Sequence, residues 1–205
     1  MIALLLAVAA PQTAVDAERA FAADAKTLGQ WTAFRKWAAD DAVLFWPQPV
    51  NAQAQLRTLN DPPRPVEWSP SESYVSCDGT VAANTGPWTR PDGSAGYFST
   101  IWVKQRQGGW KWTVDGGDAL ETPRPTVKEP AVRVASCERK PRGAIGVAPK
   151  DAKSADGQSR DHTLYWSWVV QPDGARMFNV LLWTGERYDR VIADRIAAPP
   201  APPKP

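Results

Sequence analysis

The stretch W-A-A-D-D-A-V-L-F-W-P, residues 37–47, decides the fold of this chain. A helical pattern that includes Trp31, Phe34 and Ala38 ends in the small and apolar residues of this stretch, and the two aspartates break it. The apolar run Val43–Trp46 then stops at a proline, which is typical of the end of a strand. The stretch therefore predicts a helix that passes directly into the first strand of a sheet. Asp40 and Asp41 are expected to cap the helix end and form the turn.

Helical patterns lie before this junction and just after it. One helix is predicted over Asp16–Lys26, with Asp16 as its N-cap, and a second from Trp31 once Gly29 has interrupted the first. A short third helix is predicted over Asn51–Leu59, where a cluster of aspartate and prolines follows.

From residue 66 onward the pattern is that of strands joined by short turns rich in glycine, aspartate and proline. The predicted strands are Val66–Ser76, Thr80–Thr89, Gly96–Arg106 and Trp110–Asp115. In the last of these, strict alternation puts Trp110, Trp112 and Val114 on one face, which is predicted to be buried, and Asp115 on the opposite face. Helices followed by an antiparallel meander predict the α+β class.

A β-rich extension is predicted over residues 120–196. Its strands are Val132–Cys137, Thr163–Gln171, Ala175–Trp183 and Arg187–Ile196, the last of which also fits a helix. The polar segment 138–161 is expected to be a mobile loop, and the proline-rich segment 197–205 a disordered tail. Pro91-Asp92-Gly93 and Pro172-Asp173-Gly174 each precede a tryptophan eleven residues after the proline. This is the pattern of an internal repeat, although turn chemistry alone also produces it.

Composition excludes several classes of protein. The 205-residue chain has 24 Lys and Arg against 22 Asp and Glu, a net charge of +2, so no global field attracts nucleic acid or an anionic membrane. The single histidine, His162, excludes a zinc site built from several imidazoles. The sequence Asp115-Gly116-Gly117-Asp118 is followed by prolines rather than a helix, so it is not a phosphate loop. No cofactor and no metal are expected.

The first ten residues, M-I-A-L-L-L-A-V-A-A, have the apolar core of a secretory signal, with Val8 and Ala10 suited to a cleavage site. A second candidate cut follows Ala17, so residues 1–17 are assigned to a signal segment. The alternative is an uncleaved apolar start of the first helix. No later run is long enough to span a membrane. We therefore expect a periplasmic or secreted protein.

Cys77 and Cys137 are the only two cysteines. In an oxidising compartment an even pair predicts one disulfide. It would close a loop of about 60 residues and contribute about 4 kcal/mol in the chain-entropy model.

The quoted stretch, together with G-G-W-K-W-T-V-D at residues 108–115, resembles the ketosteroid-isomerase/SnoaL-like superfamily, also called nuclear-transport-factor-two-like. The resemblance covers Asp16 to Asp118. It implies a cone of N-terminal helices packed on a curved antiparallel sheet, here residues 18–119, with a pocket inside. It does not imply a particular reaction.

The acid–base groups of ketosteroid isomerases within that superfamily are missing from this chain. The position of their aspartate general base, just before the proline, is Trp46. Their first-helix tyrosine falls near Phe21 and Ala22, and their neutral carboxylic acid falls within 97–106, which contains no acidic residue. The chain is therefore not a ketosteroid isomerase.

Eleven tryptophans predict a core built from large rings, which would line the pocket that the resemblance implies. The residues expected to bind a small apolar or aromatic molecule are Trp46, Trp68, Tyr97, Trp102 and Trp112. Asp115 and Glu67 are the candidates for a catalytic base, because a carboxylate among apolar rings has a raised pKa.

Three functions stay open at this point. The first is binding of a small apolar molecule with no assigned catalysis. The second is a SnoaL-like lyase, hydrolase or isomerase that uses a pocket carboxylate. The third is a structural module that forms a homodimer through an exposed sheet face. A carboxylate located inside the cavity would favour the second.

Overall fold

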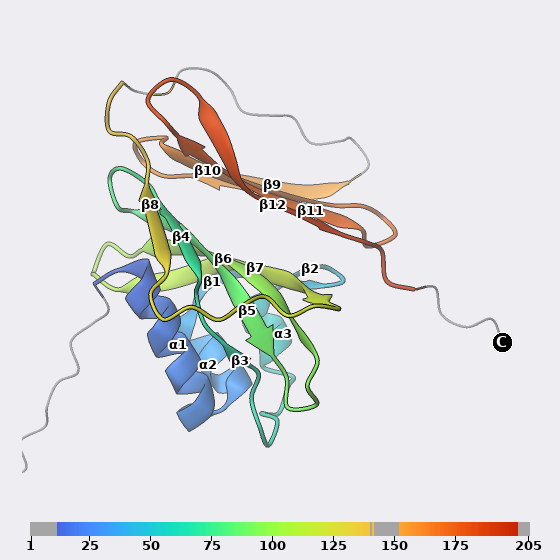
Figure 1. Ribbon diagram of the computed structural model, residues 1–205. Coiled ribbons are helices and arrows are strands. Elements are labelled where there is room, and N and C mark those ends of the chain that lie inside the picture. Colours follow the sequence, from blue (N-terminus) through green and yellow to red (C-terminus); the bar gives the residue numbers. More distant parts are fainter. Residues whose placement is uncertain (1–11, 140, 142–151, 201–205) are drawn as a thin grey trace, which may run out of the picture.

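The computed structural model describes residues 12–139, 141 and 152–200, which form two β-sheets and three helices (Figure 1). Residues 1–11 of the predicted signal segment, residue 140, residues 142–151 of the predicted loop and residues 201–205 of the predicted tail lie outside the described residues. Within the described part, no helix is both long enough and apolar enough to cross a membrane.

The first helix, α1 (Ala14–Leu28), begins two residues earlier than predicted. Thr13 is its N-cap, since the Thr13 hydroxyl accepts the Asp16 N–H and the Asp16 carboxylate accepts the Thr13 N–H. Asp16 therefore acts at the third helical position of a capping box rather than as the cap itself.

The second helix, α2 (Gln30–Trp37), ends one residue before Ala38, which the helical pattern includes, and no turn separates the helix from the sheet. Strand β1 (Ala38–Trp46) starts at the next residue. Asp40 and Asp41 lie within β1 with exposed side chains, so the expectation that they cap the helix is wrong. At the other end of the helix, Asp61 caps the N-terminus of α2 by accepting the Thr32 N–H over 3.0 Å.

The larger sheet has eight strands in the order β2-β1-β7-β6-β5-β4-β8, with β3 paired to β5. A short helix, α3 (Ala52–Leu56), follows β2. The remaining strands are β2 (Gln48–Asn51), β3 (Glu67–Trp68), β4 (Glu72–Val75), β5 (Val81–Thr89), β6 (Ala95–Lys104), β7 (Trp110–Leu120) and β8 (Ala131–Val134). The predicted strand Val66–Ser76 is thus divided into β3 and β4.

This sheet is mixed rather than antiparallel as expected. β1 runs parallel to β7, and β8 runs parallel to β4, whereas the other pairs are antiparallel. The reason for the second parallel pair is the proline-rich connection 121–130, which carries the chain back across the sheet before β8 begins.

The smaller sheet has four antiparallel strands in the order β12-β11-β10-β9. They are β9 (Lys153–Gln158), β10 (Leu164–Val170), β11 (Arg176–Trp183) and β12 (Tyr188–Ile196). β9 corrects the expectation of a loop over 138–161: this polar edge strand is held by its ladder to β10. β12 is a strand, not a helix, and pairs along its length with β11.

The larger sheet lies between the helices on one face and the smaller sheet on the other (Figure 1). Ala82, Trp102 and Trp112 belong to the core on the helix side. Ile101 and Val114 belong to the core between the two sheets. Burial of both faces explains why β5 and β6 are buried at nearly every position instead of alternating.

A β-bulge in β7 changes which side chains face the helices. Ile101 pairs with Val114 and Trp102 pairs with Trp112, so Thr113 is the extra residue. Trp112 therefore packs on the helices while Val114 packs on the smaller sheet. The strict alternation predicted for this strand is wrong after Thr113, and Asp115 returns to the helix side.

Two turns, 76–80 and 159–163, have the same sequence pattern, Ser-x-Asp-x-Thr, and the same hydrogen bonds. In each, the serine hydroxyl donates to the aspartate over 2.6 Å and the threonine N–H donates to the same carboxylate oxygen. The Asp78 N–H donates to Asp161 over 2.8 Å, and the Asp161 N–H donates to Asp78 over 3.2 Å. These reciprocal bonds join the start of β5 to the start of β10.

The predicted disulfide is confirmed. Cys77 and Cys137 are bonded, with their Cα atoms 5.3 Å apart, just beyond the ends of β4 and β8. The neighbouring Ser136 N–H donates to the Trp183 carbonyl of the smaller sheet over 2.9 Å. The crosslink thus lies where the two sheets meet.

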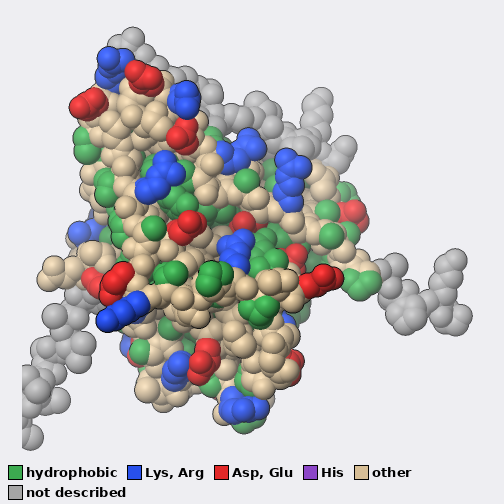
Figure 2. Space-filling model, viewed as in Figure 1, with side chains coloured by type: hydrophobic (Ala, Val, Ile, Leu, Met, Phe, Trp, Pro, Cys, Tyr) green, Lys and Arg blue, Asp and Glu red, His purple; other side chains and the backbone are tan. Residues whose placement is uncertain are grey.

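The face shown in Figure 2 carries Lys and Arg side chains interspersed with Asp and Glu. No single-sign patch dominates this view, in keeping with the net charge of +2.

Candidate functional site

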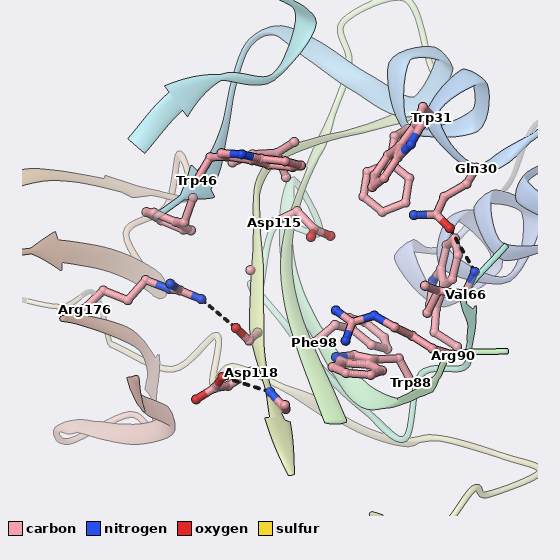
Figure 3. Close-up of a pocket in the computed structure, with 17 residues that line it drawn as sticks. Gln30, Trp31, Trp46, Val66, Trp88, Arg90, Phe98, Asp115, Asp118 and Arg176 are labelled. Carbon is pink, nitrogen blue, oxygen red and sulfur yellow. Dashed lines mark hydrogen bonds between the residues drawn. The ribbon is translucent and has the colours of Figure 1, made fainter. Parts of the chain in front are cut away.

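A cavity of about 420 Å³ lies at one end of the larger sheet, between α2, the ends of β1, β5, β6 and β7, and Arg176 of the smaller sheet (Figure 3). Its lining residues are Gln30, Trp31, Phe34, Leu44, Phe45, Trp46, Val66, Trp68, Trp88, Arg90, Phe98, Asp115, Gly116, Gly117, Asp118, Ala119 and Arg176. A space of this size fits a small organic molecule.

The wall of the cavity is mostly aromatic. The ring of Phe34 lies 5.4 Å from that of Trp31 and 5.8 Å from that of Trp68, both edge-on. Trp46 stands at the rim and is 51% exposed. Rings in such contacts are rigid and apolar, so they suit a flat or apolar ligand.

Asp115 points into this aromatic space from β7 (Figure 3). The Thr100 hydroxyl of β6 donates to Asp115 Oδ2 over 2.8 Å. Burial raises the pKa of Asp115 to about 7; the bond from Thr100 lowers it and the charge of Glu18 raises it further. Near neutral pH both protonation states of this carboxyl are therefore populated.

Glu18 of α1 lies behind the aromatic wall and is fully buried, with 0% exposure. Its carboxyl accepts Trp102 Nε1–H over 2.6 Å, Trp68 Nε1–H over 2.9 Å and Asn84 Nδ2–H over 3.3 Å. Burial raises the pKa of Glu18 to about 7, although these three bonds lower it. The indole of Trp68, which lines the cavity, thus connects the cavity wall to a second buried carboxyl.

Sequence reasoning missed Glu18, although a signal was present. Ala14, Glu18, Phe21 and Ala25 follow the four-three-four spacing of one helix face, and all four are buried. A glutamate on an otherwise apolar stripe requires buried donors, which the indoles supply.

The structure divides the predicted ligand residues into two groups. Trp46 and Trp68 line the cavity, whereas Trp102 and Trp112 are fully buried in the helix-side core and do not reach it. Tyr97 does not line the cavity either: Asp194 and Arg176 of the smaller sheet act on it electrostatically, and the Arg124 guanidinium lies 4.2 Å from the centre of its ring.

The two candidate bases, Asp115 and Glu67, lie in different environments. Asp115 lies on the cavity wall, while Glu67 is exposed and forms an ion pair with Lys26 over 3.1 Å. Glu67 therefore has neither the burial nor the position of a pocket base.

Two arginines that sequence reasoning did not select also line the cavity (Figure 3). The Arg90 guanidinium stacks 4.5 Å from the ring centre of Trp88. Arg176 comes from the smaller sheet, and its Nη2–H donates to the Gly117 carbonyl over 2.7 Å. No local pattern marks Arg176, because its approach depends on how the two sheets pack.

Across the described residues, no group of three or more His, Cys, Asp or Glu side chains is arranged to hold a metal ion. The chain matches no protein-family model, and no curated protein matches it.

Proposed function

We propose that this protein binds a small apolar or aromatic molecule in the cavity and that Asp115 transfers a proton to or from it. The observation that carries the proposal is a carboxyl with a raised pKa on an aromatic cavity wall. This corresponds to the second of the three functions, a SnoaL-like lyase, hydrolase or isomerase with a pocket carboxylate.

The chemistry follows from the environment of Asp115. A general acid–base group works best when its pKa is near the working pH, because both forms are then available. The surrounding rings keep the carboxyl poorly solvated, and Thr100 holds its orientation through one hydrogen bond. Proton abstraction next to a carbonyl group, as in isomerisation or elimination, fits one such carboxyl in an apolar site.

We also propose that residues 18–119 form the cone fold of the SnoaL-like superfamily. Two helices, a strand, a short helix and a meander that encloses a cavity are what the sequence resemblance implies. The raised pKa of Asp115 supports a pocket acid–base group at a different position from the missing aspartate before the proline.

The binding-only function remains the second candidate, and the aromatic wall supports it equally. The dimer hypothesis has less support, since the sheet face opposite the helices is covered by the smaller sheet. Export is proposed from the apolar N-terminus and the disulfide. A cut after Ala10 would leave the capping box of α1 whole, whereas a cut after Ala17 would remove it.

Proton transfer can be tested with 2-tetralone, a flat ketone with acidic C–H groups. In D₂O at pH 7, the wild type should accelerate the loss of the C1 proton signal in the ¹H NMR spectrum. Asp115→Asn should reduce the rate to background, and Asp41→Asn, an exposed change of the same chemistry, should not. Binding without acceleration, for this ketone and for acyclic analogues, would favour the binding-only function.

A further inference from the structure

We propose that the ligand of this cavity is an organic anion, an apolar or aromatic body with one carboxylate or sulfonate group, and that Arg176 binds the anionic group. The inference rests on the proposed function of the same cavity and names its ligand class. It assigns the smaller sheet a part in the site through Arg176.

Arg176 is held firmly at the cavity. It is the first residue of β11 and follows the turn 171–175, which is closed by a bond from the Gln171 N–H to the Ala175 carbonyl over 2.7 Å. Gln48 of β2 donates through Nε2 to the Gln171 carbonyl over 3.0 Å. The turn is thus attached to the larger sheet, and Arg176 needs little reorganisation to bind a ligand.

The guanidinium of Arg176 has unused hydrogen-bonding capacity. One bond goes to the Gly117 carbonyl, and the side chain lies 5.3 Å from the ring centre of Phe45. Its Nε is buried and, within the residues that the structure describes, has no hydrogen-bond partner. A buried donor without an acceptor is costly, and a carboxylate or sulfonate is the acceptor that a guanidinium binds best.

The acidic groups near Arg176 do not neutralise it by direct contact. Asp118 and Asp194 both act on it electrostatically, yet among the described residues neither forms an ion pair with it. Asp118 Oδ1 instead accepts the Ala119 N–H over 2.9 Å. Arg90 adds a second positive charge to the lining.

Asp115 and Arg176 both line the cavity, so a single ligand can contact both residues. Gly116 and Gly117 line the cavity directly after Asp115 in β7. A Cβ at Gly116 would come within 3.2 Å of the Phe45 ring, so Phe45 packs closely over this glycine and leaves little room for a side chain there. An anionic ligand in this cavity can thus lie against Asp115 and place its charged group at Arg176.

Two fluorescent probes with the same aromatic frame test this inference. 8-Anilinonaphthalene-1-sulfonate carries an anionic group, and N-phenyl-1-naphthylamine lacks it. Arg176→Gln should weaken binding of the sulfonate about tenfold or more and change the affinity for the neutral probe by less than about twofold. Arg195→Gln, an exposed arginine on the same sheet, should change neither.

An equal loss for both probes, or no loss for the sulfonate, would overturn the inference while leaving the cavity as a ligand site. If neither probe binds the wild type, both the proposed function and this inference fail. Should Arg176→Gln fail to fold, Arg176→Lys keeps the charge without the planar fork. This variant should weaken binding of the sulfonate by a smaller factor and leave the affinity for the neutral probe unchanged. Equal effects on the binding of both probes would again contradict the inference.

Discussion

Thr100 and Asp115 lie opposite each other in the β6–β7 ladder, and the threonine hydroxyl donates to Asp115 Oδ2 over 2.8 Å. This pairing exists because the bulge at Thr113 turns Asp115 toward the helices. With regular alternation, Asp115 would face the smaller sheet and the cavity would lack this carboxyl. One extra residue in a strand therefore determines the chemistry of the site.

Asp115→Asn should stabilise the protein at alkaline pH. The pKa of Asp115 is raised from 3.8 to about 7, so its contribution to stability is full below about pH 4 and is lost as the pH rises through 7. At pH 8 we expect the free energy of unfolding of the variant to exceed that of the wild type by roughly 1–3 kcal/mol. Urea unfolding at pH 8 and pH 4 measures this, with Asp41→Asn as control. A variant less stable than the wild type at pH 8 would contradict the burial of an ionised carboxyl.

Glu18 should be a structural acceptor that also affects Asp115. Glu18→Leu leaves the Trp68 and Trp102 N–H groups without an acceptor, at about 1–3 kcal/mol each, while Asn84 Nδ2 keeps its bond to the Ala14 carbonyl, so a total loss of roughly 3 kcal/mol or more is expected. Glu18→Gln keeps one acceptor and should cost less. It should also lower the pKa of Asp115, because the charge of Glu18 raises it. Urea unfolding at pH 6 measures the loss of stability. Glu67→Gln, an exposed change, is the control and should leave the free energy of unfolding unchanged. An unchanged free energy of unfolding for Glu18→Leu would refute the acceptor role.

Loss of the disulfide should be strongly destabilising. Cys77→Ala/Cys137→Ala opens a loop spanning 60 positions, and the chain-entropy model gives a cost of about 4 kcal/mol. Hydrogen exchange should increase first near Ser136 and Trp183, whose backbone bond lies beside the crosslink. Reduced wild-type protein is the control and should behave like the variant. Equal stability of the oxidised and reduced proteins would contradict this account of the crosslink.

Asp78 and Asp161 should act as a coupled pair. Each backbone N–H donates to the other carboxylate, so Asp78→Ala and Asp161→Ala should each cost about 1–3 kcal/mol. The double variant should cost less than the sum, with a coupling energy above about 0.5 kcal/mol. Strictly additive losses in urea unfolding would show that the two turns are independent.

Local features of the fold were predictable, and features that depend on strand pairing were not. The passage from α2 into β1 follows from a change of apolar spacing within a few residues, which the sequence displays directly. The bulge at Thr113 depends on how β7 aligns with β6. β9 has few apolar residues, and only its ladder to β10 makes it a strand.

The candidate site was predicted in part for the same reason. Trp46 and Trp68 line the cavity as the aromatic pattern predicts. Asp115 was also selected, but the bulge at Thr113 is what turns it into the cavity. Arg176 is separated from Asp115 by 61 positions and reaches the cavity only because the two sheets pack together. Glu18 could have been noticed as a charged residue on an apolar helix face.

The protonation of Asp115 tests the central claim most directly. A ¹³C NMR titration of the carboxyl carbons, with Asp115→Asn for assignment, should place the pKa of Asp115 at about 7. Addition of N-phenyl-1-naphthylamine should shift this resonance more than that of the exposed Asp41. A titration midpoint near 3.8, with no response to the probe, would contradict an acid–base carboxyl on the wall of a ligand cavity.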